Sequence, residues 1–332
     1  DPFIRGFGPS SPRILEISAN EKWMSVHPAV LSMVAALGLT VKPEDIRCDK
    51  FEAASGHYFV RMGLFKFLRV DPGVAVREHE PAGRFIPLTQ VRDSGELSSF
   101  ITEMIPLLHL EPEQAKTLGY IVSELARNVI EHAEAENGAI LCAQYYKKSN
   151  SIRIGIADTG VGIRETISRS HPASTDLEAI RLALTPGITG TTSKEGGTEQ
   201  NAGAGLFFIK SIATVNRDFL VVYSGSGFYK LLKKHATRKT RLHADPFKDR
   251  HSTSGDMPYW RGTVVGVDIT LDQTAEFSLL LDAIRDTYSS AVRGNRALPS
   301  PWRLARSARR RRSRRYRAGR ARSRPSSRPR PC

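Results

Sequence analysis

Apolar and polar positions follow two periods along the chain, and together they predict a mixed α/β protein. Helical spacing of apolar residues predicts helices at about 27–39, 59–70, 95–108, 113–134, 177–184, 206–215 and 276–292. Short runs rich in β-branched residues predict strands at 14–17, 140–146, 151–157, 219–224 and 263–271. The strands at 140–146 and 151–157 are joined by four polar residues, which is typical of a hairpin.

The order of these elements predicts three regions. Residues 1–100 form a small α/β interaction domain, residues 101–295 form a larger α/β domain, and residues 296–332 form a tail. Within the larger domain, the chain between Asp158 and Gly205 is rich in Gly, Thr and Ser and is predicted to be a long, mobile segment. A polar, basic insert from about 230 to 259 separates two of the predicted strands.

The tail changes how the charge of the chain is interpreted. The formal net charge is +15, but residues 303–332 contain 14 arginines and no acidic residue, so removing those 14 charges leaves about +1. A segment of this composition cannot bury enough apolar surface to fold. Two interpretations stay open: the tail binds nucleic acid nonspecifically through phosphates, or it is the product of a shifted reading frame in a GC-rich gene.

The cysteines and the apolar runs indicate a reducing, aqueous location. Cys48, Cys142 and Cys332 are far apart and odd in number, which favours neither a disulfide framework nor a Cys-based metal site. No apolar run reaches the roughly 18 to 20 residues that span a bilayer. We therefore expect a cytoplasmic protein with no membrane partner.

The first motif with chemical potential is Ser123-Glu124-Leu125-Ala126-Arg127-Asn128 on a predicted helix. Glu124 and Asn128 are four residues apart, so they share one helix face. An Asn oxygen can complete the shell of a Mg²⁺ ion on substrate phosphates, and a carboxylate one turn away can act as a general base. Taken singly, the pair is more often an ordinary solvated helix face.

The second motif is a buried strand that runs into Asp158-Thr159-Gly160-Val161-Gly162. A carboxylate at a strand end can accept a hydrogen bond from an exocyclic amine, and the glycines let the backbone approach a flat ring. The alternatives are a tight turn or a fragment of a calcium loop, although the further oxygen ligands of an EF-hand are missing.

The third motif is Gly203-Ala204-Gly205-Leu206 at the start of a predicted helix. A glycine-rich turn at a helix N-terminus exposes backbone N–H groups and favours bound anions. By itself it is also a common junction between a loop and a helix.

In this order the three motifs resemble the N, G1 and G2 boxes of the GHKL superfamily, over about residues 115–275. The resemblance implies a two-layer α/β sandwich, the Bergerat ATP-binding fold, with ATP and Mg²⁺ as cofactors and a lid at about 164–202. It also implies a role for each matching residue: Glu124 as general base, Asn128 as Mg²⁺ ligand, Asp158 as reader of the adenine amine, Gly160 and Gly162 around the base, Gly203, Gly205 and Leu206 on the phosphates, and Thr263 near the adenine.

The residue type at position 124 also bears on the type of GHKL protein that the chain resembles. ATPases and serine kinases of the superfamily have a general base at the position that matches Glu124, whereas many histidine kinases have Asn there. No phosphoacceptor helix is evident around His109, which stands close before Pro112. The chain is therefore most similar to the anti-sigma serine-kinase type. Residues 14–70 distantly resemble the STAS-like segments that precede some GHKL domains; an unrelated α/β unit is the alternative.

These inferences predict a regulatory Mg-ATP-binding protein with slow ATP hydrolysis or phosphotransfer to a protein serine. The alternatives are a nucleotide-gated binding switch without turnover and a histidine kinase-like sensor fragment. A protein partner of regulatory type and a homodimer are both compatible with the resemblance. The sequence names neither the partner nor the phosphoacceptor.

Overall fold

The computed structural model describes residues 14–18, 26–48, 56–71, 84–188, 205–232, 242–271, 282 and 284–290. Several predicted features lie outside the described residues: Gly203, residues 189–202 of the predicted lid, much of the predicted helix at 276–292 and the Arg-rich tail. Within the described part, no helix combines the length and the apolar character that crossing a membrane requires.

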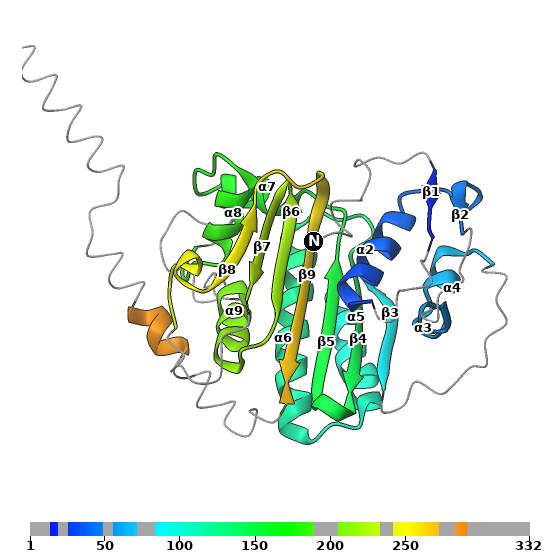
Figure 1. Cartoon of the computed structure of the whole chain (residues 1–332), viewed down its shortest axis with the longest axis horizontal. Helices are drawn as coiled ribbons and strands as arrows, with labels where there is room; N and C mark the ends of the chain where they lie inside the picture. The colour runs from blue at the N-terminus through cyan, green and yellow to red at the C-terminus, as the bar shows by residue number, and fades with distance from the viewer. Residues whose placement is uncertain are drawn as a thin grey trace, which may run out of the picture.

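A seven-stranded antiparallel sheet in the order β3-β4-β5-β9-β6-β7-β8 forms the centre of the molecule (Figure 1). Its strands are β3 (Phe85–Val91), β4 (Ala139–Tyr146), β5 (Ser151–Ala157), β6 (Leu220–Gly225), β7 (Gly227–Leu231), β8 (His251–Ser254) and β9 (Trp260–Thr270). The β4–β5 hairpin confirms the sequence prediction, with Tyr146 opposite Ser151 and Ile140 opposite Ala157. Its register places Asp158 at the end of β5, beside the first half of β9.

One face of the sheet is covered by helices that pack on alternate strand residues. These helices are α5 (Ser94–Ser99), α6 (Pro112–His132), α7 (Gly162–Ser168), α8 (Asp176–Ala183) and α9 (Gly205–Asn216). Ile154 and Ile156 of β5 and Val265 and Val267 of β9 point into this layer and are nearly inaccessible to solvent. The sheet and these helices form the predicted α/β sandwich (Figure 1).

The other face of the sheet is covered by α2 (Pro28–Gly38), which packs on β4 and β5. Two strand residues lack side chains where α2 crosses: a Cβ on Gly155 would stand 2.1 Å from the amide nitrogen of Ala29, and one on Gly266 would stand 2.9 Å from the Ala29 side chain. Any side chain at Gly155 would therefore push α2 off the sheet. The remaining N-terminal elements are β1 (Leu15–Glu16), parallel to β2 (Ile46–Arg47), and the helices α3 (Gly56–Arg61) and α4 (Leu64–Leu68).

The N-terminal segment thus contributes to the large sheet as well as to its cover. β3 lies within residues 1–100 and is the edge strand next to β4. The predicted boundary near residue 100 and the STAS-like resemblance of residues 14–70 stay predictions.

Three segments contain structure that periodicity did not predict. The basic insert contains the end of β7, a 3₁₀ turn at Pro246–Lys248 and β8. The first part of the predicted lid contains most of α7, which periodicity did not predict. It also contains α8, which confirms the helix predicted at 177–184 and buries Ala179 and Ile180 completely. The helix predicted at 95–108 is α5 followed by a π-helical turn at Phe100–Met104 and a 3₁₀ turn at Pro106–Leu108.

Candidate functional site

The helix α6 carries Glu124 and Asn128. Pro112 in its first turn and a reciprocal capping box between Glu111 and Gln114 begin the helix. Its apolar stripe faces the sheet, and Glu124 and Asn128 lie on the half-buried flank of that stripe. Because they are one turn apart, both side chains leave the helix in the same direction.

Gly205, the first residue of α9, lies directly against this pair. A Cβ atom on Gly205 would stand 2.4 Å from Oε2 of Glu124 and 3.7 Å from Nδ2 of Asn128. The backbone at the start of α9 can come this close only because residue 205 has no side chain. The structure therefore brings together the first and third motifs, which are about 80 residues apart in the chain.

The environment of Glu124 favours its protonated form more than water does. Burial raises the pKa of Glu124, and Glu131 raises it further, while the nearby Arg127 acts in the opposite direction. A carboxyl group with a raised pKa next to the N-terminus of α9 is suited to accept a proton from a bound hydroxyl or water.

The amide nitrogen of Asn128 is buried and has no hydrogen-bond partner within the described residues. A buried polar group without a partner costs roughly 1 to 3 kcal/mol. Asn128 therefore fits a site that a ligand acceptor, such as a phosphate oxygen, completes. The described residues contain no group of three or more His, Cys, Asp or Glu side chains placed to hold a metal ion.

Asp158 occupies the buried end of β5 and is 1% exposed. Its Oδ1 accepts a hydrogen bond from the amide of Gly160 at 2.8 Å, and its own amide donates to the carbonyl of Thr263 at 2.9 Å. Burial raises the pKa of Asp158 to about 7, although hydrogen bonds from Gly160 and Thr263 oppose the shift. A carboxylate with this pKa is ready to accept one further hydrogen bond from a ligand donor.

The turn after Asp158 requires both of its glycines. A Cβ on Gly160 would stand 2.0 Å from the carbonyl oxygen of Ala133, and Gly162 has a φ of +80°. The amide of Val161 donates to that same Ala133 carbonyl at 2.7 Å. Since Ala133 directly follows α6, this contact ties the Asp158 turn to the helix that carries Glu124 and Asn128.

Thr263 lies where the resemblance places it, on β9 beside Asp158. Its hydroxyl is 3.4 Å from Oγ of Ser224, which donates to the carbonyl of Gly262 at 2.7 Å and accepts from the amide of Ile163 at 2.9 Å. Leu206 is half-buried at the start of α9 and packs on the helical core. Every predicted site residue except Gly203 is thus described.

Three residues of this arrangement were missed by sequence reasoning as site residues. Ser224 joins β6, β9 and α7, and the indole Nε1 of Trp260 donates to the carbonyl of Asp158 at 3.0 Å. Gly262 has a φ of +104°, and a Cβ there would stand 2.3 Å from the Asp158 carbonyl oxygen. Of these three residues, only Gly262 stands out in the sequence, as part of the Gly262-Thr263 dipeptide. Ser224 and Trp260 reach the site through the pairing of β6 with β9, which the local sequence does not predict.

A cavity of about 400 Å³ lies between α7, the beginning of α8 and the strand ends at Gly225 and Trp260. It shares Gly162, Ser224 and Trp260 with the arrangement above, but Glu124, Asn128 and Asp158 do not line it. We place the candidate site at those three residues, because their chemistry and their contacts with Gly160 and Gly205 converge there.

Comparison with protein families found a matching family model. Residues 89–216 match the family model of the histidine kinase-like ATPase domain. The matched region runs from β3 to the end of α9 and contains Glu124, Asn128, Asp158 and Gly205. A comparison with curated proteins found no match to this sequence. The family match supports the GHKL-type resemblance and with it nucleotide binding by this region.

Proposed function

We propose that this protein binds Mg-ATP between α6, the Asp158 turn and the start of α9, and that it acts as a regulatory ATPase or protein serine kinase of GHKL type. The observation that carries the proposal is the approach of Gly205 to Glu124 and Asn128. It joins a helix N-terminus, which favours phosphates, to an amide and a carboxyl group suited to Mg²⁺ and to proton transfer.

In this proposal Asp158 selects the base. A buried carboxylate that accepts hydrogen bonds from the backbone of Gly160 and Thr263 still has lone pairs for the exocyclic amine of adenine. Guanine presents a carbonyl oxygen at the corresponding position, which would face the carboxylate unfavourably. Gly160 and Gly162 keep the wall of the base pocket free of side chains, and Thr263 lies beside it.

At the other end, the backbone amides at the start of α9 bind phosphate oxygens, and Asn128 holds the Mg²⁺ ion that accompanies them. That ion, when bound, neutralises charge on the phosphates. Glu124 accepts the proton of the attacking water or serine hydroxyl, which its raised pKa makes easier.

Titration calorimetry of Mg-ATP into the full chain tests binding, with Asp158→Asn as the matched control. The wild type should show saturable binding, and the variant should lose at least about ten-fold in affinity, because its amide can turn a donor toward the adenine amine. Absence of binding by folded wild type would overturn the proposal.

Glu124→Gln then tests chemistry. The variant keeps the size of the side chain and cannot accept a proton, so Mg-ATP affinity should stay within about three-fold while turnover falls about 100-fold or more. Phosphate release and transfer of labelled phosphate to protein serine are both measured. A wild type that binds ATP with no turnover for the variant to lose is a nucleotide-gated switch.

A further inference from the structure

The helix α9 is buried on all sides, which is unusual for a helix next to a ligand site. Its residues from Phe207 to Thr214 are each less than 9% exposed, and they include one charged residue, Lys210, at 0%. A lysine in such a position is costly unless its ammonium group is fully paired. The partners of Lys210 therefore identify what covers the outer side of α9.

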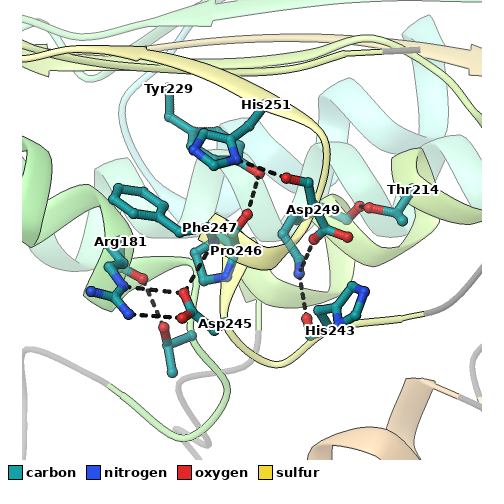
Figure 2. Close-up of polar contacts among 11 residues, drawn as sticks. Arg181, Thr214, Tyr229, His243, Asp245, Pro246, Phe247, Asp249 and His251 are labelled. Carbon is teal, nitrogen blue, oxygen red and sulfur yellow. Dashed lines mark hydrogen bonds and ion pairs between the residues drawn. The ribbon is translucent and has the colours of Figure 1, made fainter. Parts of the chain in front are cut away.

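Two hydrogen-bond partners of Lys210 come from the segment between β7 and β8. The Nζ atom of Lys210 donates to the carboxylate of Asp249 at 2.9 Å and to the backbone carbonyl of His243 at 2.6 Å (Figure 2). The Lys210 and Asp249 side chains are both 0% exposed, and the ammonium lies 5.2 Å from the ring centroid of Phe207. We call residues 243–249 the clip.

The clip is held at a second point by α8. The guanidinium of Arg181 donates two hydrogen bonds to Asp245, at 3.1 and 2.7 Å, and lies over the Phe247 ring at 5.0 Å (Figure 2). The clip therefore joins α8 to α9, the two helices on either side of residues 189–204.

The sheet edge supports the clip from a third side. The Phe247 ring stacks on His251 at 5.0 Å between ring centroids, and the Tyr229 hydroxyl donates to the carbonyl of Pro246 at 3.1 Å. Nδ1 of His251 lies 2.7 Å from the carbonyl oxygen of Asp249. These contacts hold the backbone of Asp249 in place, so the carboxylate that meets Lys210 has a fixed position.

We propose that Lys210 and Asp249 are positioning residues, which fix the first turn of α9 against Glu124 and Asn128 and thereby set the affinity for the phosphates of the nucleotide. This inference rests on the proposed function. Lys210 is five residues after Gly205, roughly 7.5 Å along a helix axis at 1.5 Å per residue. A continuous helix transmits a displacement at Lys210 to Gly205, whose backbone lies against the Glu124 carboxylate.

The variant that tests this is the double substitution Lys210→Met/Asp249→Leu. A single substitution leaves one charge buried without its partner and risks unfolding the protein, whereas exchanging both partners for apolar residues of similar size preserves folding. The double variant retains packing but loses the directed bonds from Nζ to Asp249 and to the carbonyl of His243.

Two measurements on the full chain separate positioning from general stability. Calorimetry with Mg-ATP and with adenosine should show at least about ten-fold weaker ATP binding in the double variant, with adenosine affinity within about two-fold of wild type. Hydrogen exchange without nucleotide should be at least about ten-fold faster at the amides of residues 206–209 and unchanged in the middle of α6.

The matched control is Arg169→Ala, which removes the exposed ion pair between Arg169 and Glu134 (2.6 Å). It should change neither measurement. Equal weakening of ATP and adenosine, or unchanged exchange at 206–209 in the double variant, would overturn the proposal. If wild type binds no ATP, the proposed function fails, and the exchange data still report whether the clip holds α9.

Discussion

The two ends of the candidate site differ in how completely their polar groups are satisfied within the protein. At the base end, Asp158 makes hydrogen bonds through its side chain, its amide and its carbonyl, to Gly160, Thr263 and Trp260. At the phosphate end, the Asn128 amide nitrogen has no partner among the described residues. One end is assembled before any ligand arrives, and the other is incomplete.

This difference assigns separate tasks to the two ends. A rigid, satisfied base end selects a ligand at little cost in conformational entropy, because nothing there has to be ordered on binding. An incomplete phosphate end carries a stability cost in the free protein that a nucleotide with Mg²⁺ would relieve. Substitutions at each end test this difference, from the largest expected effect to the smallest.

The largest effect is expected at the base end from Gly262→Ala. The new methyl group would stand 2.3 Å from the Asp158 carbonyl oxygen, in a backbone conformation with a φ of +104° that alanine rarely adopts. We expect the free energy of unfolding, measured with denaturant, to fall by about 3 kcal/mol. Gly255→Ala is the control, because a Cβ at Gly255 has no atom within 4 Å. Equal stability of the two variants would show that the base end is not rigid.

A second effect at the base end is a dependence of stability on pH. The pKa of Asp158 rises from 3.8 to about 7 on folding, so the folded state binds this proton more tightly than the unfolded state. The stabilisation is complete below about pH 4 and is lost as the pH rises through about 7.

Between pH 5 and pH 8 the free energy of unfolding that the Asp158 proton contributes falls by about 3 kcal/mol, which is equivalent to roughly two pKa units. The Asp158→Asn variant cannot titrate at this position. The free energy of unfolding of the variant minus that of wild type should therefore increase by about this amount as the pH rises from 5 to 8. Parallel pH profiles of the two proteins would contradict the assignment.

At the phosphate end, Gly205→Ala should affect activity more than stability. The added methyl group would stand 2.4 Å from Oε2 of Glu124, which is the far end of a flexible side chain and can move. We expect turnover to fall about 100-fold, with less than about 1 kcal/mol change in the free energy of unfolding. Gly119→Ala in α6 is the control, since its Cβ would make ordinary contacts at 3.8 Å. A large loss of stability in Gly205→Ala alone would mean that Glu124 is fixed.

The sequence predicted the elements of the site better than the contacts between them. The helix with Glu124 and Asn128, the strand that ends at Asp158 and the helix after Gly205 all have strong local patterns, and all three are found. Capping, periodicity and glycine turns act over a few residues, so a single sequence contains their signal.

What the sequence did not predict depends on pairing between distant strands and helices. The clip lies in a basic insert without apolar periodicity, and its order comes from a single buried lysine on another element and from stacked rings. The same holds for α2, whose place on the sheet depends on the missing side chains of Gly155 and Gly266. Such contacts join residues that are far apart in the chain, so they produce no local pattern from which the sequence alone could predict them.

The smallest expected effect is a gain of stability at the phosphate end. Asn128→Leu replaces a buried amide that lacks a partner with an apolar side chain of similar size, so the ligand-free protein should become about 1 kcal/mol more stable. Thermal unfolding with and without Mg-ATP measures this. The nucleotide should stabilise the variant less than it stabilises wild type, because the variant lacks the oxygen proposed to bind Mg²⁺.

Asn128→Asp is the companion variant, since it keeps an oxygen at this position and should recover part of the stabilisation by Mg-ATP. A ligand-free Asn128→Leu protein that is less stable than wild type would mean that the amide is already satisfied. In that case the two ends of the site would be equally complete, and relief of unsatisfied groups could not contribute to nucleotide affinity. If the stability rises instead, the cost of an open phosphate end in the free protein is measured directly.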